Sequence, residues 1–280
     1  MSVSAEIQIS DLHIGSKFSV MHPLNGANQT QNKVQRWAFK TWNKEFLPDV
    51  ERILDTYKPD YVHLSELGDL GELDYKNRNG EEVWTRKDTD IVENHARLLA
   101  PLYNMVDSVT FVRGTRAHIG EDGGIDEKIA ADCDKTNPTD DKKSDGNKVK
   151  AGWYAEFTLS GVHFEIAHHG KNRSKWTDIN GLTSLGNEIL LKRAKNGQKI
   201  PDVVSRGNYH YGEHTPYDKK PYVISLPSWQ LPNTFVFRID PTVETPHVGG
   251  HVVIARDGKV IYAERLRYFP ERNKVQCLIK

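Results

Sequence analysis

Four clusters of Asp, His and Asn, each next to a glycine, follow a fifth cluster, Asp11-Leu12-His13, along this chain. Each stands at or near the end of a strand-like run, and the first ends the run 5–10. Side chains two residues apart on an extended strand point to the same side, so Asp11 and His13 can face one ion. Such clusters predict an α/β fold that places ligand-bearing loops at one rim of its sheets.

Hydrophobic periodicity predicts alternating strands and helices, followed by a β-rich C-terminal half. The pattern favours a mixed α/β sandwich in a single domain over residues 1–280, with a mobile polar insertion around 134–150. The expected helices cover 33–57, with a break at Pro48, and 91–105, with a kink at Pro101, then 124–133 and 187–195. The expected strands cover 5–10, 61–64, 108–112, 153–159, 162–167, 203–204, 222–225, 234–239, 251–255 and 259–262.

Composition narrows the function classes. Lys plus Arg and Asp plus Glu number 38 each, and zero net charge argues against binding polyanions through bulk charge. Cys133 and Cys277 make no disulfide framework, so we expect a reduced, cytoplasmic setting. No apolar stretch approaches the roughly 20 residues of a membrane helix, and residues 1–4 lack a signal-peptide pattern. We therefore expect no membrane association.

The residue types in the clusters point to metal chemistry. Carboxylates, imidazoles and an amide oxygen can hold two divalent ions a few ångström apart. Two such ions bind a phosphoryl oxygen and lower the pKa of a bridging water, which supplies a nucleophile without a covalent intermediate. The candidate residues at the strand ends are Asp11, His13, Asp69, His118, His168, His169, Asn208 and His210.

The order of these motifs resembles that of the calcineurin-like metallophosphoesterases, across about two thirds of the chain. That family carries Asp-x-His, Gly-Asp, Gly-Asn-His, a His beside Gly, and Gly-His-x-His in order. The runs 114–120, 167–170 and 226–230 are most similar to the branch found in bacteriophages and prophages, which implies the host cytoplasm as location. The matching segments here are Asp11/His13, Gly68-Asp69, Gly114…His118, His169-Gly170 and Gly207-Asn208-Tyr209-His210.

The resemblance implies two mixed β-sheets flanked by helices and a role for each matching residue. Asp11, His13 and His210 would hold a first metal, and Asp69 would bridge the two ions. His169 or His168, with Asn208, would help to hold the second, and the position of His169 before a glycine favours His169. His118 would be the catalytic histidine that protonates the leaving alkoxide. The implied ions are Mn²⁺ first, with Mg²⁺, Fe, Zn²⁺ or Ni²⁺ as alternatives.

The chain departs from the family pattern at two positions. Thr115 follows Gly114 where the family has Asn, with two residues inserted before His118. Asn208 stands where the last motif begins with His. A weak second metal site, or His118 as a ligand, is therefore an alternative to the regular two-metal centre.

Three functions remain open at this stage: a hydrolase of phosphate mono- or diesters, a nuclease acting on DNA or RNA, and a catalytically silent relative that binds phosphate or a partner. Arg116 could pair with a phosphate or form a surface salt bridge. Basic residues within 171–199 could line an approach to the site or form a solvated helix face. Trp176 and Trp229 are candidates for a pocket wall or a base-stacking surface, whereas Trp37 and Trp42 are expected in the core.

The remaining histidines are given lesser roles. His214 is a rival of His210 that would only line the pocket. The others are expected to be structural or at the surface: His22, His63, His95, His163, His247 and His251.

Overall fold

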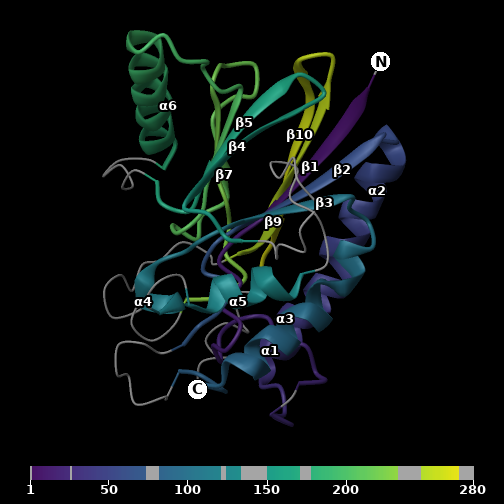
Figure 1. Ribbon diagram of the computed structural model, residues 1–280. Helices are drawn as coiled ribbons and strands as arrows, with labels where there is room; N and C mark the ends of the chain where they lie inside the picture. The colour runs from purple at the N-terminus through teal and green to yellow at the C-terminus, as the bar shows by residue number, and fades with distance from the viewer. Residues whose placement is uncertain are drawn as a thin grey trace, which may run out of the picture.

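Two mixed five-stranded β-sheets pack face to face and carry helices on their outer faces (Figure 1). This computed structural model describes residues 2–25, 27–73, 82–120, 124–133, 150–170, 178–232 and 247–270. The predicted α/β sandwich with helices on both sides is confirmed. Residues 134–149 of the insertion proposed around 134–150, and the proposed strand 234–239, lie outside the described residues.

The first sheet has the strand order β10-β9-β1-β2-β3. Its three parallel strands β1, β2 and β3 end at the same edge, and β9 and β10 complete it as an antiparallel hairpin. The turn Asp257-Gly258 of that hairpin is confirmed. The strands are β1 (Val3–Ile9), β2 (Tyr61–Leu67), β3 (Ser108–Val112), β9 (Val248–Arg256) and β10 (Lys259–Tyr268).

The second sheet has the order β4-β5-β6-β8-β7. Strands β5, β6 and β8 are parallel, and the outer strands β4 and β7 run antiparallel to their neighbours. The strands are β4 (Tyr154–Leu159), β5 (Val162–Ala167), β6 (Val203–Arg206), β7 (Glu213–His214) and β8 (Tyr222–Ser225).

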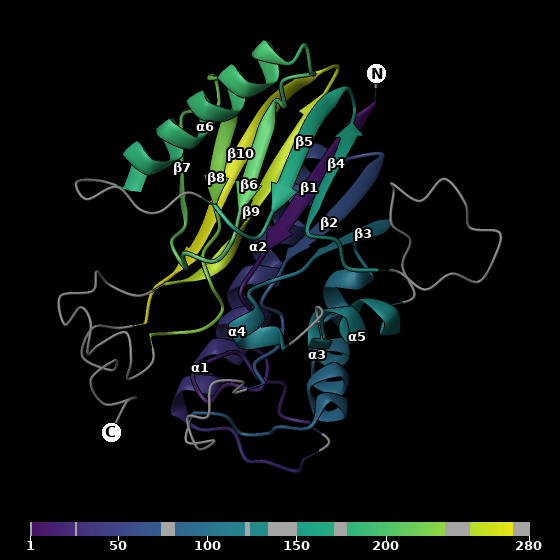
Figure 2. The same ribbon diagram turned by 60° about the vertical axis from the view of Figure 1, so that its left-hand side comes forward.

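Most helices cover the first sheet, and α6 lies along the outer face of the second (Figure 2). The break expected at Pro48 lies just before it, as the π-helical turn η1. Pro48 itself lies in the first turn of α2, where proline is tolerated. Helix α3 continues through Pro101 to Tyr103. The helical elements are α1 (Lys33–Thr41), η1 (Trp42–Phe46), α2 (Leu47–Tyr57), α3 (Asp88–Tyr103), α4 (Arg116–Ile119), α5 (Gly124–Asp132) and α6 (Asp178–Lys195).

Strand β1 is covered on both faces. Its apolar residues Ala5, Ile7 and Ile9 belong to the core between the first sheet and the helices. Its alternating polar residues are also buried, because they face the second sheet, where Ser205 Oγ donates to Gln8 Oε1 at 2.8 Å. The strand therefore delivers Asp11 and His13 into the interior. Within the described residues, no helix has both the length and the apolar character needed to cross a membrane.

Candidate metal centre

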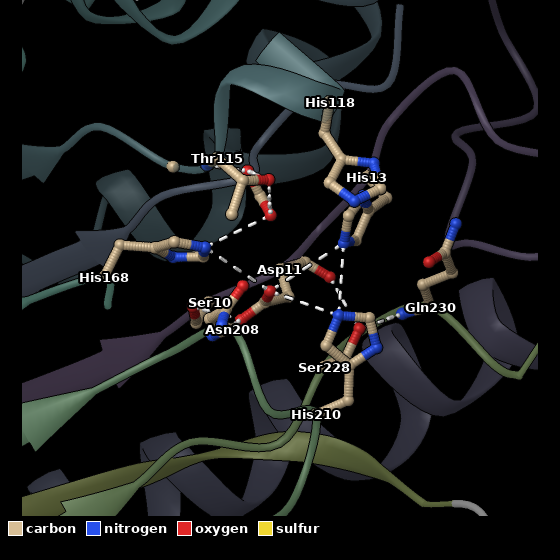
Figure 3. Close-up of polar contacts among 12 residues, drawn as sticks. Ser10, Asp11, His13, Thr115, His118, His168, Asn208, His210, Ser228 and Gln230 are labelled. Atoms are coloured by element: carbon tan, nitrogen blue, oxygen red, sulfur yellow. Dashed lines mark hydrogen bonds and ion pairs between the residues drawn. The ribbon is translucent and has the colours of Figure 1, made fainter. Parts of the chain in front are cut away.

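The polar clusters meet at one end of the sandwich, where parallel strands of both sheets end (Figure 3). Three strands of the first sheet and two of the second contribute. Asp11 and His13 follow β1, Asp69 follows β2, and Thr115 and His118 follow β3; His168 follows β5, and Asn208 and His210 follow β6. The sequence-based prediction that these distant segments converge is consistent with this arrangement.

Five of these residues have a left-handed backbone. Their φ angles are 53° at Asp11, 44° at His13, 50° at Asp69, 70° at Asn208 and 60° at His210. Each such residue costs on the order of 1–3 kcal/mol, which the surrounding structure must offset. Asp, Asn and His are the side chains found most often in this region. The strand-end turns are thus built from residues that both tolerate the backbone and can bind an ion.

Hydrogen bonds from distant segments hold the Asp11 turn in this conformation. The carbonyl of Asp11 accepts from the backbone N–H of Trp229 at 3.0 Å and from Ser228 Oγ at 2.9 Å. The backbone N–H of Asp11 donates to the Gly68 carbonyl at 3.0 Å. The segment 226–231, which follows β8, therefore stabilises the turn at Asp11 although it contributes no candidate metal ligand.

Two glycines allow the loops to approach each other. Gly68 has φ of 79°, and a Cβ there would lie 2.6 Å from the backbone nitrogen of Gly114. A Cβ on Gly207 would lie 2.1 Å from Ser10 Oγ. Contacts this short are not tolerated, so the glycines in the Gly-Asp and Gly-Asn-Tyr-His motifs are required by packing.

Asp11 Oδ1 is the centre of the site. It is buried and has no hydrogen-bond partner. Three imidazole nitrogens surround it: His210 Nε2 at 3.2 Å, His13 Nε2 at 3.8 Å and His168 Nε2 at 4.0 Å. A buried carboxylate oxygen without a donor is costly unless a cation completes it. This orphaned oxygen fits a metal ion that all four atoms could share.

The second carboxylate, Asp69, extends this arrangement. Asp69 Oδ2 lies 3.1 Å from His168 Nε2, yet this nitrogen has no hydrogen bond of suitable geometry. Potential ligand atoms come within 4.8 Å of one another in overlapping groups, and each of Asp11, Asp69 and His13 belongs to two of them. Shared carboxylates between adjacent groups suit two neighbouring divalent ions. The groups are Asp11–His13–His210, His13–Asp69–His118 and Asp11–Asp69–His168.

The charge distribution also favours cations. Burial lowers the pKa of His13, but the nearby carboxylates of Asp11 and Glu72 outweigh burial and raise this pKa to about 10. For His168, the carboxylates of Asp69 and Asp11 outweigh burial and raise the pKa to about 9. Burial would raise the pKa of Asp11, but the imidazoles of His168 and His210 hold it well below its usual range. The carboxylates thus create a strongly negative pocket that attracts protons or a metal ion.

Glu72 and Asp126 belong to the site and were not predicted. Glu72 Oε2 accepts from His118 Nδ1 at 2.6 Å and from His13 Nδ1 at 3.1 Å. Burial would raise its pKa, but the two imidazoles lower the pKa of Glu72 to about 2. The carboxylate of Asp126, on α5, accepts from the backbone N–H groups of Leu70 and Gly114 at 3.1 and 2.9 Å. Burial and the charge of Asp69 raise the pKa of Asp126 to about 7.

A signal for Glu72 was present in the sequence. It stands three residues after the predicted ligand Asp69 and directly after Gly71. Asp126 carries no comparable signal, because it lies within a helix that only the tertiary structure brings to the strand ends.

The structure places the two neighbouring histidines differently from the sequence-based preference. His168 is buried against both carboxylates, whereas His169 is exposed and lies outside the three ligand groups. His168 is further fixed by its Nδ1, which lies 2.5 Å from the Leu67 carbonyl. This geometry favours His168 over His169 as the candidate ligand, opposite to the preference drawn from the sequence.

The other candidates occupy mixed positions. The backbone N–H of Asn208 donates to Asp11 Oδ2 at 3.0 Å, and Arg116 is exposed on α4. His214 contacts Tyr222 and His251 between the sheets.

The prediction that Trp229 forms a pocket wall or base-stacking surface is wrong. Its ring is fully buried against Trp42 and Phe46, because the segment 226–231 packs under the first helical layer.

The proposed basic approach within 171–199 is only partly described. Residues 171–177, which include Trp176, lie outside the described residues. On α6, Arg193 pairs with Glu156 and Glu165, and Lys192 pairs with Glu188. These ion pairs neutralise two of its positive charges.

Comparison with known proteins gives only distant similarities. No protein-family model and no curated protein matches the chain. A single mutant of Vps29 from Entamoeba histolytica is 13% identical, with 94% of this chain and 99% of that chain covered and a TM-score of 0.38. The phosphoesterase Yfce from E. coli is 12% identical, with the same two coverages and a TM-score of 0.38. A predicted phosphoesterase from Streptococcus pneumoniae is 11% identical, with 96% and 99% covered and a TM-score of 0.32.

Sequence identities and TM-scores this low do not support an inference about activity. The function of the chain has to be inferred from the geometry of its own site.

Proposed function

We propose that this chain is a metal-dependent phosphoester hydrolase. The observation that carries the proposal is the buried, unpartnered Asp11 Oδ1, which faces His13, His168 and His210 beside a second carboxylate, Asp69. Carboxylate and imidazole donors suit Mn²⁺ first, and also Mg²⁺, Fe, Zn²⁺ or Ni²⁺. Asp11, His13 and His210 would hold one ion, and Asp69 and His168 the other.

Divalent ions held there would polarise a phosphoryl group and lower the pKa of a water molecule. The protein supplies their ligands at the ends of the four strands β1, β2, β5 and β6, so little reorganisation is needed on binding. Most of these ligands are fully buried, which strengthens every electrostatic interaction in the site.

His118 is the candidate acid for the leaving oxygen. Its side chain is 26% exposed, so a substrate can reach it. Its Nδ1 is bonded to Glu72, which leaves Nε2 to donate a proton. His118 also packs edge-on against His13, with ring centroids 4.6 Å apart, so the acid stands next to the candidate metal ligands. Arg116, on the same short helix, is the candidate for phosphate binding.

The test is hydrolysis of aryl phosphate mono- and diesters by the full chain, with and without a chelator. We expect Mn²⁺-dependent turnover that the chelator abolishes. Asp69→Asn and His210→Ala should each reduce turnover by at least about 100-fold. Asp69→Asn removes the negative charge of a carboxylate ligand, and His210→Ala removes an imidazole ligand. Asp55→Asn, on the exposed face of α2, is the matched control. Undiminished turnover in Asp69→Asn would reject the mechanism.

The same assay addresses the silent alternative, a relative that binds phosphate or a partner without turnover. Binding of Mn²⁺ and phosphate with no hydrolysis of either ester type would favour it. Preference for a monoester or a diester would then define the substrate class of an active enzyme.

A further inference from the structure

Each of the two central carboxylates is hydrogen-bonded by a hydroxyl and by a backbone N–H, and one of its oxygens is directed at an imidazole nitrogen. Asp11 Oδ2 lies 2.5 Å from Ser10 Oγ and accepts from the backbone N–H of Asn208 at 3.0 Å. Its other oxygen, Oδ1, is the unpartnered atom that faces the histidines. Ser10 is fully buried, so its hydroxyl does not contact bulk water.

Asp69, in the neighbouring loop, is likewise bound by a hydroxyl and a backbone N–H. Asp69 Oδ1 accepts from the backbone N–H of Thr115 at 2.5 Å and from Thr115 Oγ1 at 3.0 Å. The hydroxyl also lies 2.9 Å from Oδ2, the oxygen that faces His168 Nε2. A Cβ on Gly114 would lie 2.0 Å from Asp69 Oδ1, so this oxygen is confined on that side as well.

From these contacts we infer that Ser10 and Thr115 are positioning residues, which fix the orientation in which each carboxylate meets a metal ion. The inference rests on the proposed function. A carboxylate that rotates freely about its Cβ–Cγ bond offers either oxygen, and fixing it in advance removes that freedom before the ion binds. Hydrogen bonds to the ligating carboxylates of metal sites typically contribute 10- to 100-fold in metal affinity.

Removal of either hydroxyl leaves one backbone N–H on the carboxylate oxygen. Ser10→Ala leaves Asp11 Oδ2 with the Asn208 N–H alone, and Thr115→Val leaves Asp69 Oδ1 with the Thr115 N–H. Thr115→Ser keeps the hydroxyl and should restore affinity. Ser205→Ala removes a buried hydroxyl that bonds Gln8 between the sheets, so it is the matched control.

The experiment is calorimetric titration of the chelator-stripped full chain with Mn²⁺ at one fixed pH, together with thermal unfolding of the metal-free proteins. We expect Ser10→Ala and Thr115→Val each to weaken at least one binding step by about 10- to 100-fold. Thr115→Ser and Ser205→Ala should bind as the wild type does. A merely structural hydroxyl would change the unfolding temperature but not the Mn²⁺ affinity.

The outcomes separate this inference from the proposed function. If the wild type binds Mn²⁺ and both variants bind with unchanged affinity, the positioning role is rejected while the proposed function stands. If the wild type binds no Mn²⁺, both are rejected.

Discussion

At the scale of single residues, Glu72 connects two imidazoles that have different roles in the proposed function. One carboxylate oxygen accepts from Nδ1 of the candidate ligand His13 and from Nδ1 of the candidate acid His118. These bonds place a proton on Nδ1 of both rings. His13 can then present an unprotonated Nε2 to an ion, whereas His118 acts as an acid in the form that carries a second proton on Nε2. Glu72 therefore fixes a ligand and an acid at once.

Glu72→Gln should lower kcat by about 10- to 100-fold, because a neutral amide removes the negative charge that binds both imidazole N–H groups. Steady-state hydrolysis over a pH range measures the effect, and a changed pH profile would distinguish loss of orientation from loss of stability. Glu93→Gln is the control, since Glu93 forms an exposed pair with Arg97 on α3. An unchanged kcat and pH profile in Glu72→Gln would contradict this role.

The choice between His168 and His169 shows what the sequence could and could not predict about single residues. Neighbouring side chains at a strand end point to opposite sides, so only one of the pair can enter the site. Phe164 and Ile166 belong to the core between the sheets, and His168 continues their parity. Adjacency to glycine favoured His169 instead. Which face of β5 is covered by the other sheet follows from tertiary packing, and local sequence does not encode it.

At the scale of elements, the segment 226–231 after β8 is the link between the site and the helical layer. Trp229 packs edge-on against Trp42, with centroids 4.7 Å apart, and against Phe46 at 5.3 Å. Its backbone N–H donates to the Asp11 carbonyl, and its carbonyl accepts from Val20 at 3.2 Å. The buried indole anchors the backbone groups that hold the Asp11 turn.

Trp229→Ala should reduce the free energy of unfolding by about 3–5 kcal/mol, as expected for a large aromatic side chain removed from a packed core. Urea denaturation of the metal-free protein measures this loss. Trp153→Ala is the control, since Trp153 is 56% exposed, and it should change stability by no more than about 0.5 kcal/mol. Equal stability losses in the two variants would contradict the core assignment of Trp229.

Most elements were predictable from periodicity, and the departures have physical causes. Strand β3 and strand β8 have the predicted bounds, whereas β10 extends to Tyr268 because pairing with β9 continues beyond the local apolar pattern. Helix α6 begins nine residues before its expected start at 187. Its N-terminal half includes Leu182, which packs with Val204 and Val223 of the second sheet. The local sequence around Leu182 does not reveal this contact.

At the scale of the whole molecule, the interface between the sheets holds polar groups as well as apolar ones. Glu6, His63 and Ser205 are all fully buried. Burial raises the pKa of Glu6 well above its usual range, despite hydrogen bonds from Ser65 and Gln8. Burial also lowers the pKa of His63 to about 3, against a weaker opposing effect of Ser108. The packing of the two sheets thus requires both side chains to be neutral.

The neutral state of His63 predicts acid sensitivity of the fold. The folded pKa lies below the unfolded value of about 6.5, so the unfolded chain binds the extra proton first. Stability is therefore present above about pH 6.5 and is lost progressively as the pH falls toward about 3. Between pH 7 and pH 5, this one group should reduce the free energy of unfolding by about 2 kcal/mol.

His63→Leu tests this contribution, because it removes the titrating ring while keeping an apolar contact for Phe157. Ser108 Oγ keeps a partner in the variant, since Tyr61 Oη donates to it at 2.6 Å. We expect the stability of the variant to fall by about 2 kcal/mol less than that of the wild type between pH 7 and pH 5. Urea denaturation of both metal-free proteins at each pH gives this difference, in which the contributions of the metal-site histidines cancel because both chains contain them. Parallel pH dependence in the two proteins would show that His63 does not couple protonation to the packing of the sheets.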